Sequence, residues 1–463
     1  LTLQKLHEIV GGRLRLATLA PSHGEATPMQ RIVTDSRQVR VGDVFWGLRG
    51  TRFDGANFAV EAYSRGAVGT VVGKYVQPWP HCFSLQVHDS QLALHSLARW
   101  NRQRMAGQVV AVTGSVGKTT TRQMIRSVLA TRFCGSASPR NFNNQIGLPL
   151  SMLAIEPEHD FAVLELAASG PGEILQLASL CRPQIGVITK IGDAHLRGFG
   201  SVHGVAEAKT ELLPVLPADG WAVLGGDDPR LRKLASRART NIVWFGRSLD
   251  NDLVATNIRS RGGRLSFSVD GTSMSVGVWG RHHLSGALAA VAVGRIFGIC
   301  DAEIAHGLAQ FQPPPMRCQI TKLDGATIID DTYNASPVAM RAALELLRDF
   351  DAHGRRIVVC GDMGELGDEA ESLHYNLGDQ VVTLCGADRL VAFGSHAEEV
   401  VAGARAAGMP RDHGTACHER QELIEICRSL MQSGDVVLVK GSRQMAMEQL
   451  VEALRQQPRS CAA

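Results

Sequence analysis

A glycine-rich loop near residue 114 has the residue types that hold phosphate groups. The segment TGSVGKTTT follows an all-apolar run, Val109 to Val112, and precedes a stretch with apolar residues at helical spacing. In this strand–loop–helix context, backbone N–H groups curl around phosphate oxygens, the lysine reaches the outer phosphates and a hydroxyl can ligate Mg²⁺. The residues predicted to bind the phosphates of ATP are Gly114, Ser115, Val116, Gly117, Lys118, Thr119 and Thr120.

The loop is a shortened variant of the full Walker spacing, because Val112 stands where a further glycine is expected. The alternative interpretation is a glycine turn before a helix with an incidental lysine. The Lys-Thr-Thr sequence in register with the helix start favours the nucleotide site.

Length and composition indicate a multidomain globular protein. A chain of 463 residues exceeds the size that one hydrophobic core usually serves, so about three domains are expected. The composition is 44% hydrophobic and 20% charged, and the formal net charge is +3. This charge is too small for an electrostatic surface that binds nucleic acid, whereas acidic small molecules fit as partners.

The ten cysteines are scattered without a CxxC pair. This pattern predicts neither a zinc site nor a disulfide framework, and it favours reduced thiols in the cytoplasm. We find no apolar stretch of the roughly 18 residues that a membrane span needs, and no secretory signal pattern at the N-terminus. A cytoplasmic protein without a membrane span is therefore expected.

Apolar periodicity predicts three successive α/β domains, at residues 1–87, 88–314 and 315–463. In the first domain, short β-like runs are expected at 31–33, 44–46 and 70–72, and a helix is expected at 59–64. After a helix near 91–104, apolar runs at 109–112, 162–166, 185–188 and 221–224 alternate with helical stretches, which is typical of a doubly wound, mostly parallel sheet.

Two further features divide the rest of the chain. Asp270-Gly271 separates two alternating runs, 265–269 and 274–278, and predicts a small antiparallel hairpin. The triple proline at 313–315 marks the boundary to the last domain. In that domain, strands expected at 327–329, 357–359, 389–393 and 436–439 alternate with helices and indicate a Rossmann-like α/β fold.

Together with the loop, four further motifs resemble the Mur ligase family over nearly the whole chain. They are the nine residues from Asn141 to Pro149, DDTYNASP from Asp330, GDMGELG from Gly361 and VKGSR from Val439. The first domain adds TDSR from Thr34 and GDVF from Gly42. The pattern is most similar to the members that add D-alanyl-D-alanine to UDP-N-acetylmuramoyl-tripeptide, and it implies ATP-dependent formation of an amide bond through an acyl phosphate in peptidoglycan synthesis.

The resemblance implies roles for individual residues. Glu165, at the end of an expected strand, corresponds to the family's metal-binding glutamate, and His195 to a histidine that binds a second Mg²⁺. Lys209 corresponds to a lysine that the family carries as a carbamate; by itself it would be interpreted as a solvated helix lysine. With Lys118, these residues form the predicted catalytic set, and the predicted metal ligands are Thr119, Glu165, His195 and Lys209.

Other residues are implied to contact the nucleotide and the substrates. Arg317, Asp331 and Asn334 resemble residues that reach ATP from the last domain, which is also implied to bind the incoming dipeptide. Without the resemblance, Arg317 could equally be an ordinary surface cation, and Asp331 and Asn334 could equally belong to a polar turn. The predicted substrate-binding residues are Asp35, Ser36, Arg37, Asn143, Asn144, Lys440, Ser442 and Arg443. A monomer is expected.

Several positions depart from the family pattern. Ser169-Gly170 stands where Asn-His is usual, His283 and Gly286 where asparagines are usual, and Met316 where a glycine precedes Arg317. Gly286 removes an amide that would help to read adenine, so the sequence leaves the base specificity open. Two alternative functions stay open: a related ligase that adds a single amino acid, and an ATP-binding switch or scaffold.

Overall fold

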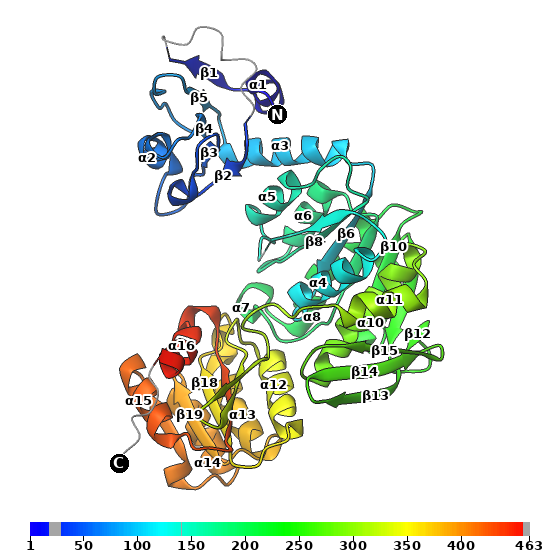
Figure 1. Ribbon diagram of the computed structural model, residues 1–463, viewed down its shortest axis with the longest axis vertical. Coiled ribbons are helices and arrows are strands. Elements are labelled where there is room, and N and C mark those ends of the chain that lie inside the picture. The colour runs from blue at the N-terminus through cyan, green and yellow to red at the C-terminus, as the bar shows by residue number, and fades with distance from the viewer. Residues whose placement is uncertain (18–28, 140, 457–463) are drawn as a thin grey trace. The chain divides into compact units, whose positions relative to one another are not determined.

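The computed structural model describes residues 1–17, 29–139 and 141–456, in which the strands form four sheets (Figure 1). The density of internal contacts divides the chain into two compact units. The first unit holds Leu1–Val109, Cys134–Leu166 and Gln176–Arg182. The second holds Val110–Phe133, Ala167–Leu175 and Pro183–Ala463.

The N-terminal part of the first unit is a five-stranded sheet with the order β1-β5-β4-β3-β2. Its strands and helices are α1 (Leu3–Val10), β1 (Arg13–Leu16), β2 (Ile32–Val33), β3 (Val44–Gly47), α2 (Ala59–Ser64), β4 (Gly69–Val72), β5 (Phe83–Gln86) and α3 (Ser90–Arg104). The predicted runs at 31–33, 44–46 and 70–72 and the helix at 59–64 are confirmed. Helix α3 begins where Asp89 accepts hydrogen bonds from the N–H groups of Gln91 and Leu92.

The middle of the chain forms a seven-stranded sheet with the order β12-β11-β10-β9-β6-β8-β7. Every strand pair with an assigned register in it is parallel. Its strands are β6 (Gln108–Thr113), β7 (Gly135–Ala137), β8 (Phe161–Glu165), β9 (Ile185–Ile188), β10 (Trp221–Gly225), β11 (Asn241–Gly246) and β12 (Leu253–Val254). Because the chain builds outward from β6 in both directions, the predicted doubly wound sheet is confirmed.

Helices accompany these strands along the chain. They are α4 (Lys118–Leu129), α5 (Gly147–Leu153), α6 (Glu173–Cys181), α7 (Leu196–Phe199), α8 (Val202–Thr210), α9 (Pro229–Leu234) and α10 (Leu284–Ile296). Helix α10 is buried over most of its length, which explains why its sequence is almost entirely apolar and small.

The predicted hairpin belongs to a separate three-stranded antiparallel sheet. Its strands are β13 (Thr256–Arg261), β14 (Arg264–Val269) and β15 (Thr272–Val276), and α11 (Asp301–Ala309) packs on β15. Asp270 and Gly271 turn between β14 and β15 with φ angles of 48° and 82°. Two positive φ angles are what a tight hairpin turn requires, so the Asp-Gly prediction is confirmed.

The C-terminal part of the second unit is a six-stranded sheet with the order β16-β17-β21-β18-β19-β20. Among the described strands of this sheet, only the edge strand β16 is antiparallel to its neighbour. The elements are β16 (Gln319–Leu323), β17 (Ala326–Asp330), α12 (Pro337–Asp349), β18 (Arg356–Gly361), α13 (Ala370–Thr383), β19 (Arg389–Phe393), α14 (Ala397–Ala406), β20 (Gly414–Cys417), α15 (Arg420–Leu430), β21 (Val436–Lys440) and α16 (Glu448–Gln456).

Helices cover both faces of this sheet (Figure 1). The core on one face is built with α12, α13 and α14, and the core on the other with α15 and α16. The Rossmann-like prediction is therefore confirmed. The triple proline lies in an irregular segment between α11 and β16. The limits 1–87, 88–314 and 315–463 stay predictions.

Candidate active site

The phosphate loop lies between β6 and α4 in the second unit, in the predicted strand–loop–helix context. Gly114 has a φ angle of 142° and lies so close to Thr189 that a side chain would overlap its hydroxyl. Gly117 has a φ angle of 81° at the start of α4. Ser115 N–H donates to the Lys190 carbonyl at 2.8 Å. Both glycines are thus required by the backbone path, and the turn after β9 holds the loop.

Lys118 and Thr119 begin α4 and carry the functional groups of the loop. The Lys118 ammonium donates to the carbonyl of Gly114 at 2.9 Å, so the side chain folds back over the loop. Thr119 is buried, and its hydroxyl accepts a hydrogen bond from Arg317 at 3.1 Å. The positive end of the helix and the ammonium both lie at the loop, which suits an anionic ligand.

Arg317 is held by an unusual backbone and by an aromatic ring. Its neighbours Met316 and Cys318 have φ angles of 59° and 52°, a left-handed conformation that costs about 1–3 kcal/mol for a non-glycine residue. The Arg317 guanidinium lies 4.0 Å from the centre of the Tyr333 ring. A glycine before the arginine would adopt this backbone without strain, so Met316 keeps the conformation at an energetic cost.

Lys209 lies at the end of α8 and is 1% exposed. Its interpretation as a solvated helix lysine is therefore wrong. The ammonium donates to the Ala168 carbonyl at 3.1 Å and lies 5.0 Å from the centre of the Phe199 ring. Burial, followed by the nearby charge of Lys118, lowers the pKa of Lys209 to about 7. A large fraction of this amine is thus neutral near pH 7.

His195 precedes α7 with a φ angle of 55°, and its Nδ1 contacts the carboxylate of Glu365. Burial lowers the pKa of His195; Glu365 opposes this shift, and the charges of Lys118 and Lys209 add to it. The second unit therefore brings Lys118, His195 and Lys209 close enough to influence one another. Glu365 lies inside the GDMGELG motif but was not singled out, because only the fold places it against His195.

Glu165 and Asn143 form a pair in the first unit. Glu165 ends β8, is 2% exposed, and accepts a hydrogen bond from the Asn143 amide at 2.8 Å. Asn144 instead lies just before α5, where its side-chain oxygen accepts hydrogen bonds from the N–H groups of Ile146 and Gly147. Of the two predicted asparagines, Asn143 thus contacts a predicted catalytic residue and Asn144 contacts the backbone at the start of α5.

The ends of β17 and β21 bring Asp331, Asn334 and Lys440 together. The Lys440 ammonium is buried and donates to the Asp331 carboxylate at 2.5 Å and to the Asn334 carbonyl at 2.8 Å. Asn334 accepts from the Arg443 N–H at 3.3 Å, and Ser442 N–H donates to the Asp362 carbonyl at 3.0 Å. The residues predicted to contact ATP, Asp331 and Asn334, are therefore joined by hydrogen bonds to Lys440 and Arg443, which are predicted to bind substrate.

The sequence was compared with protein-family models and with known proteins, and both comparisons find similar proteins. Residues 112–294 match the Mur ligase middle domain, and residues 316–443 match the Mur ligase glutamate ligase domain. The UDP-N-acetylmuramoyl-tripeptide--D-alanyl-D-alanine ligase of Bacillus subtilis is 35% identical over 99% of both chains. The chain belongs to the Mur ligase family.

Solved structures of this family extend the comparison to the whole fold. A crystal structure of MurF from Acinetobacter baumannii is 31% identical to this Mur ligase, with a TM-score of 0.87 over 98% of this chain and 99% of that chain. MurF from Thermotoga maritima, in complex with ADP, is 30% identical, with a TM-score of 0.78 over 92% and 97% of the chains. The predicted three-domain α/β fold is thus confirmed for this Mur ligase.

The TDSR motif forms a local turn in the first unit of this Mur ligase. Asp35 accepts hydrogen bonds from the Arg37 guanidinium, which lowers the pKa of Asp35 to about 2. The Ser36 hydroxyl donates to Glu61 at 2.7 Å. The Arg37 side chain stays 78% exposed, so a cation faces solvent from this turn.

The departure at Gly286 has a packing reason in this Mur ligase. A Cβ atom at Gly286 would lie 2.7 Å from the Thr121 hydroxyl, so α10 and α4 approach closely at this point. An asparagine here requires Thr121 to move. The absence of an asparagine amide at position 286 therefore goes together with the close contact between α10 and α4.

The nine described cysteines are free thiols, and Cys461 lies outside the described residues. Within the part of the chain that the structure describes, no helix is long and apolar enough to cross a membrane.

Proposed function

We propose that this Mur ligase joins D-alanyl-D-alanine to UDP-N-acetylmuramoyl-tripeptide in peptidoglycan synthesis, with ATP converted to ADP and phosphate. The observation that carries the proposal is the similarity over 99% of both chains to the Bacillus subtilis enzyme of that name. The phosphate loop supports the use of ATP. Lys118 folds back over this loop, and Arg317 donates a hydrogen bond to Thr119 at its end.

The reaction requires two steps that concentrate negative charge. First, a carboxylate oxygen of the tripeptide attacks the γ-phosphorus of ATP, which forms an acyl phosphate and releases ADP. The amine of the dipeptide then attacks the acyl carbon, and the tetrahedral intermediate expels phosphate. The cations of Lys118 and Arg317 can stabilise the transferring phosphoryl group, so positioning and electrostatics suffice without a protein nucleophile.

Thr119, Glu165 and His195 are the residues that would hold Mg²⁺, with a modified Lys209. Their donor atoms fit this ion: the Thr119 hydroxyl oxygen acts as an acceptor, Glu165 is a buried carboxylate, and the lowered pKa of His195 favours the neutral imidazole. When bound, Mg²⁺ neutralises charge on the phosphate oxygens. Lys118 and Arg317 orient the same phosphates from the protein side.

Lys209 is proposed to carry a carbamate. A neutral amine adds to CO₂ and releases a proton, and the pKa of about 7 leaves much of Lys209 neutral near pH 7. The product is an anion next to Lys118, which would relieve the repulsion between the two ammonium groups. An anionic oxygen there suits a hard cation.

The remaining assignments are part of the same proposal. Asp35, Ser36 and Arg37 in residues 1–87 contact the UDP group, and the middle residues 88–314 bind ATP. Residues 315–463 bind the dipeptide and approach the nucleotide through Asp331 and Asn334. Asn143, Lys440, Ser442 and Arg443 position the substrates, and the protein acts as a cytoplasmic monomer.

The test is release of phosphate from ATP in the presence of both substrates, against each substrate alone and against a panel of single amino acids. The ligase turns over repeatedly, with release of phosphate, only when the UDP-linked tripeptide and D-alanyl-D-alanine are both present. Equal turnover with a single amino acid would instead support the related ligase.

Replacement of Lys209 by alanine separates the ligase from an ATP-binding switch. The K209A ligase loses turnover and regains part of it with added short carboxylic acids, which replace the missing carbamate oxygens. Nucleotide binding that is unaffected by K209A, without substrate-dependent turnover in the wild type, would support the switch.

A further inference from the structure

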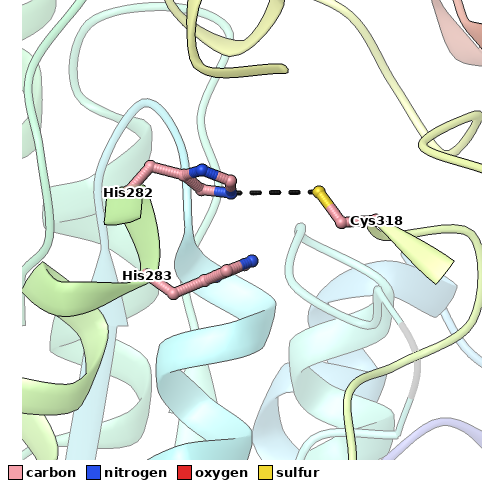
Figure 2. A group of neighbouring side chains, drawn as sticks. All are labelled: His282, His283 and Cys318. Carbon is pink, nitrogen blue, oxygen red and sulfur yellow. Dashed lines mark hydrogen bonds between the residues drawn. The ribbon is translucent and has the colours of Figure 1, made fainter. Parts of the chain in front are cut away.

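Three metal-ligating side chains meet at the start of α10, and none of them is among the residues assigned to Mg²⁺. His282 and His283 precede α10, and Cys318 follows Arg317 (Figure 2). The Cys318 sulfur lies 3.9 Å from His282 Nε2, and one ligand atom of each residue lies within 4.8 Å of the other two. The two imidazole rings are 4.1 Å apart between their centres.

This donor set suits a soft or borderline metal and not Mg²⁺. Thiolate and imidazole are the preferred ligands of Zn²⁺, whereas Mg²⁺ takes oxygen ligands. Bonds of about 2.0 Å to nitrogen and about 2.3 Å to sulfur place the ligand atoms of a tetrahedral zinc roughly 3.3–3.8 Å apart. The observed spacing is slightly wider, so side-chain rotations that move the ligand atoms inward by about 1 Å would close the site.

The surrounding packing holds these three residues near one another. Trp279, just before the histidines, stacks on Phe350 with ring centres 4.7 Å apart and packs against the core that contains Cys318. The Cys318 N–H donates to the Asp331 carboxylate at 3.2 Å, and Cys318 itself is 6% exposed. The cluster therefore rests on two independently anchored segments.

Burial acts on all three side chains: it disfavours the charged imidazolium of both histidines, and together with the nearby Asp331 carboxylate it raises the pKa of the Cys318 thiol. His282 keeps an exposed face, yet the protein atoms packed around its ring lower its pKa to about 4. Burial and the neighbouring His282 hold the pKa of His283 well below its usual range. Neutral imidazoles offer a nitrogen lone pair to a cation without first losing a proton.

We propose that His282, His283 and Cys318 form a Zn²⁺ site with three protein ligands. Cys318 binds as the thiolate and its thiol proton passes to water, so one proton leaves for each zinc bound. A water molecule completes the fourth position, since His282 also lines a cavity of about 310 Å³. The expectation of no zinc site rested on local cysteine spacing, which cannot reveal ligands from segments 36 residues apart.

The site would fix the segment that carries Arg317. Cys318 is bonded to Arg317 in the chain, and His283 comes directly before α10, which packs against α4. A metal that joins the two segments would hold the left-handed backbone at residues 316 and 318 in place. This function adds to the proposed ligase activity and does not depend on it.

Zinc titration of the full-length, untagged and chelator-treated protein, in excess Mg²⁺, tests the site. The variants are C318S, H283N and, as a matched control, C134S, which removes an exposed thiol outside the cluster. The wild type and C134S are expected to bind about one zinc per chain, whereas C318S and H283N bind more than about 100-fold more weakly. Equal zinc affinity in all four proteins, or no zinc bound by the wild type, would overturn the proposal.

Cobalt supplies a readout that does not depend on the folding of the variants. Co²⁺ bound to the wild type should produce a thiolate-to-metal charge-transfer band and the visible bands of a tetrahedral ion. This spectrum should persist in C134S. Wild-type protein that binds Co²⁺ without the thiolate band contradicts the role of Cys318.

Discussion

Arg317 donates a hydrogen bond to Thr119 at 3.1 Å, although 198 residues separate them in the chain. The contact joins the segment before β16 to the first turn of α4. It places a guanidinium, stacked on Tyr333, beside the hydroxyl that is proposed to bind Mg²⁺. The charge and the direction of this side chain are therefore both expected to matter for phosphoryl transfer.

Replacement of Arg317 by alanine is expected to lower kcat by about 10²–10³-fold, because a positioned cation is lost from the transferring phosphoryl group. R317K keeps the charge but not the planar contact with Tyr333, so an intermediate loss is expected. Phosphate release under saturating substrates measures the effect. R264A, which changes an exposed arginine on β14, is the control. Wild-type turnover by R317A would remove Arg317 from the mechanism.

Lys209 makes stability depend on pH in a defined direction. Its pKa is about 7 in the folded protein and near 10.5 in the unfolded chain. Between these values the unfolded chain binds more protons, so the free energy of unfolding rises with pH, by at most about 1.4 kcal/mol per pH unit. Below pH 7 both states are protonated and the penalty of burial is fully present.

The comparison is between the wild type and K209M in urea denaturation from pH 6 to pH 10 in roughly unit steps, in buffers free of CO₂. The wild type should gain stability relative to K209M as the pH rises above about 7. A stability difference that stays constant over this range would mean that Lys209 is charged in the folded protein.

The ion pair of Lys440 with Asp331 should contribute strongly to the stability of the last domain. The two side chains are 4% and 13% exposed, so removal of the carboxylate leaves a buried ammonium without its anionic partner. D331A is expected to destabilise the protein by about 3–5 kcal/mol, and D331A/K440M by less than the sum of the single changes. Urea denaturation of the four proteins measures the coupling. Strict additivity would show that the pair is energetically unimportant.

Gly378 allows the backbones of α13 and α14 to touch. A Cβ atom there would overlap the Val400 carbonyl and lie 2.7 Å from the Ala404 nitrogen. Alanine gains about 1 kcal/mol of helix propensity over glycine, yet G378A is expected to lower the free energy of unfolding by about 1–3 kcal/mol because the helices must separate. Gly277, which has open space around it, provides the neutral control G277A. Stabilisation by G378A would refute this packing argument.

Local sequence patterns were sufficient to predict most of the central strands and the Asp-Gly hairpin. Runs such as 185–188 and 389–393 coincide with β9 and β19, because a strand buried on both faces must be continuously apolar. The Asp-Gly turn at residue 270 was equally clear, since few residues adopt two positive φ angles. Several strands were missed. Two of them, β1 and β16, are short edge strands with mixed exposure, for which alternation is weak. The buried strand β5 was also missed, because four residues are too few for a clear pattern.

Most of the strands and helices, the phosphate loop and the family could be read from the sequence, because each depends on the residues and spacing within short segments. The environment of Lys209 depends on the folded structure, since its neighbours come from α4, α7 and the segment after β8. The same holds for Glu365 beside His195, and for the grouping of Cys318 with His282 and His283. Contacts between distant segments depend on how strands and helices pack, and no local spacing records that packing.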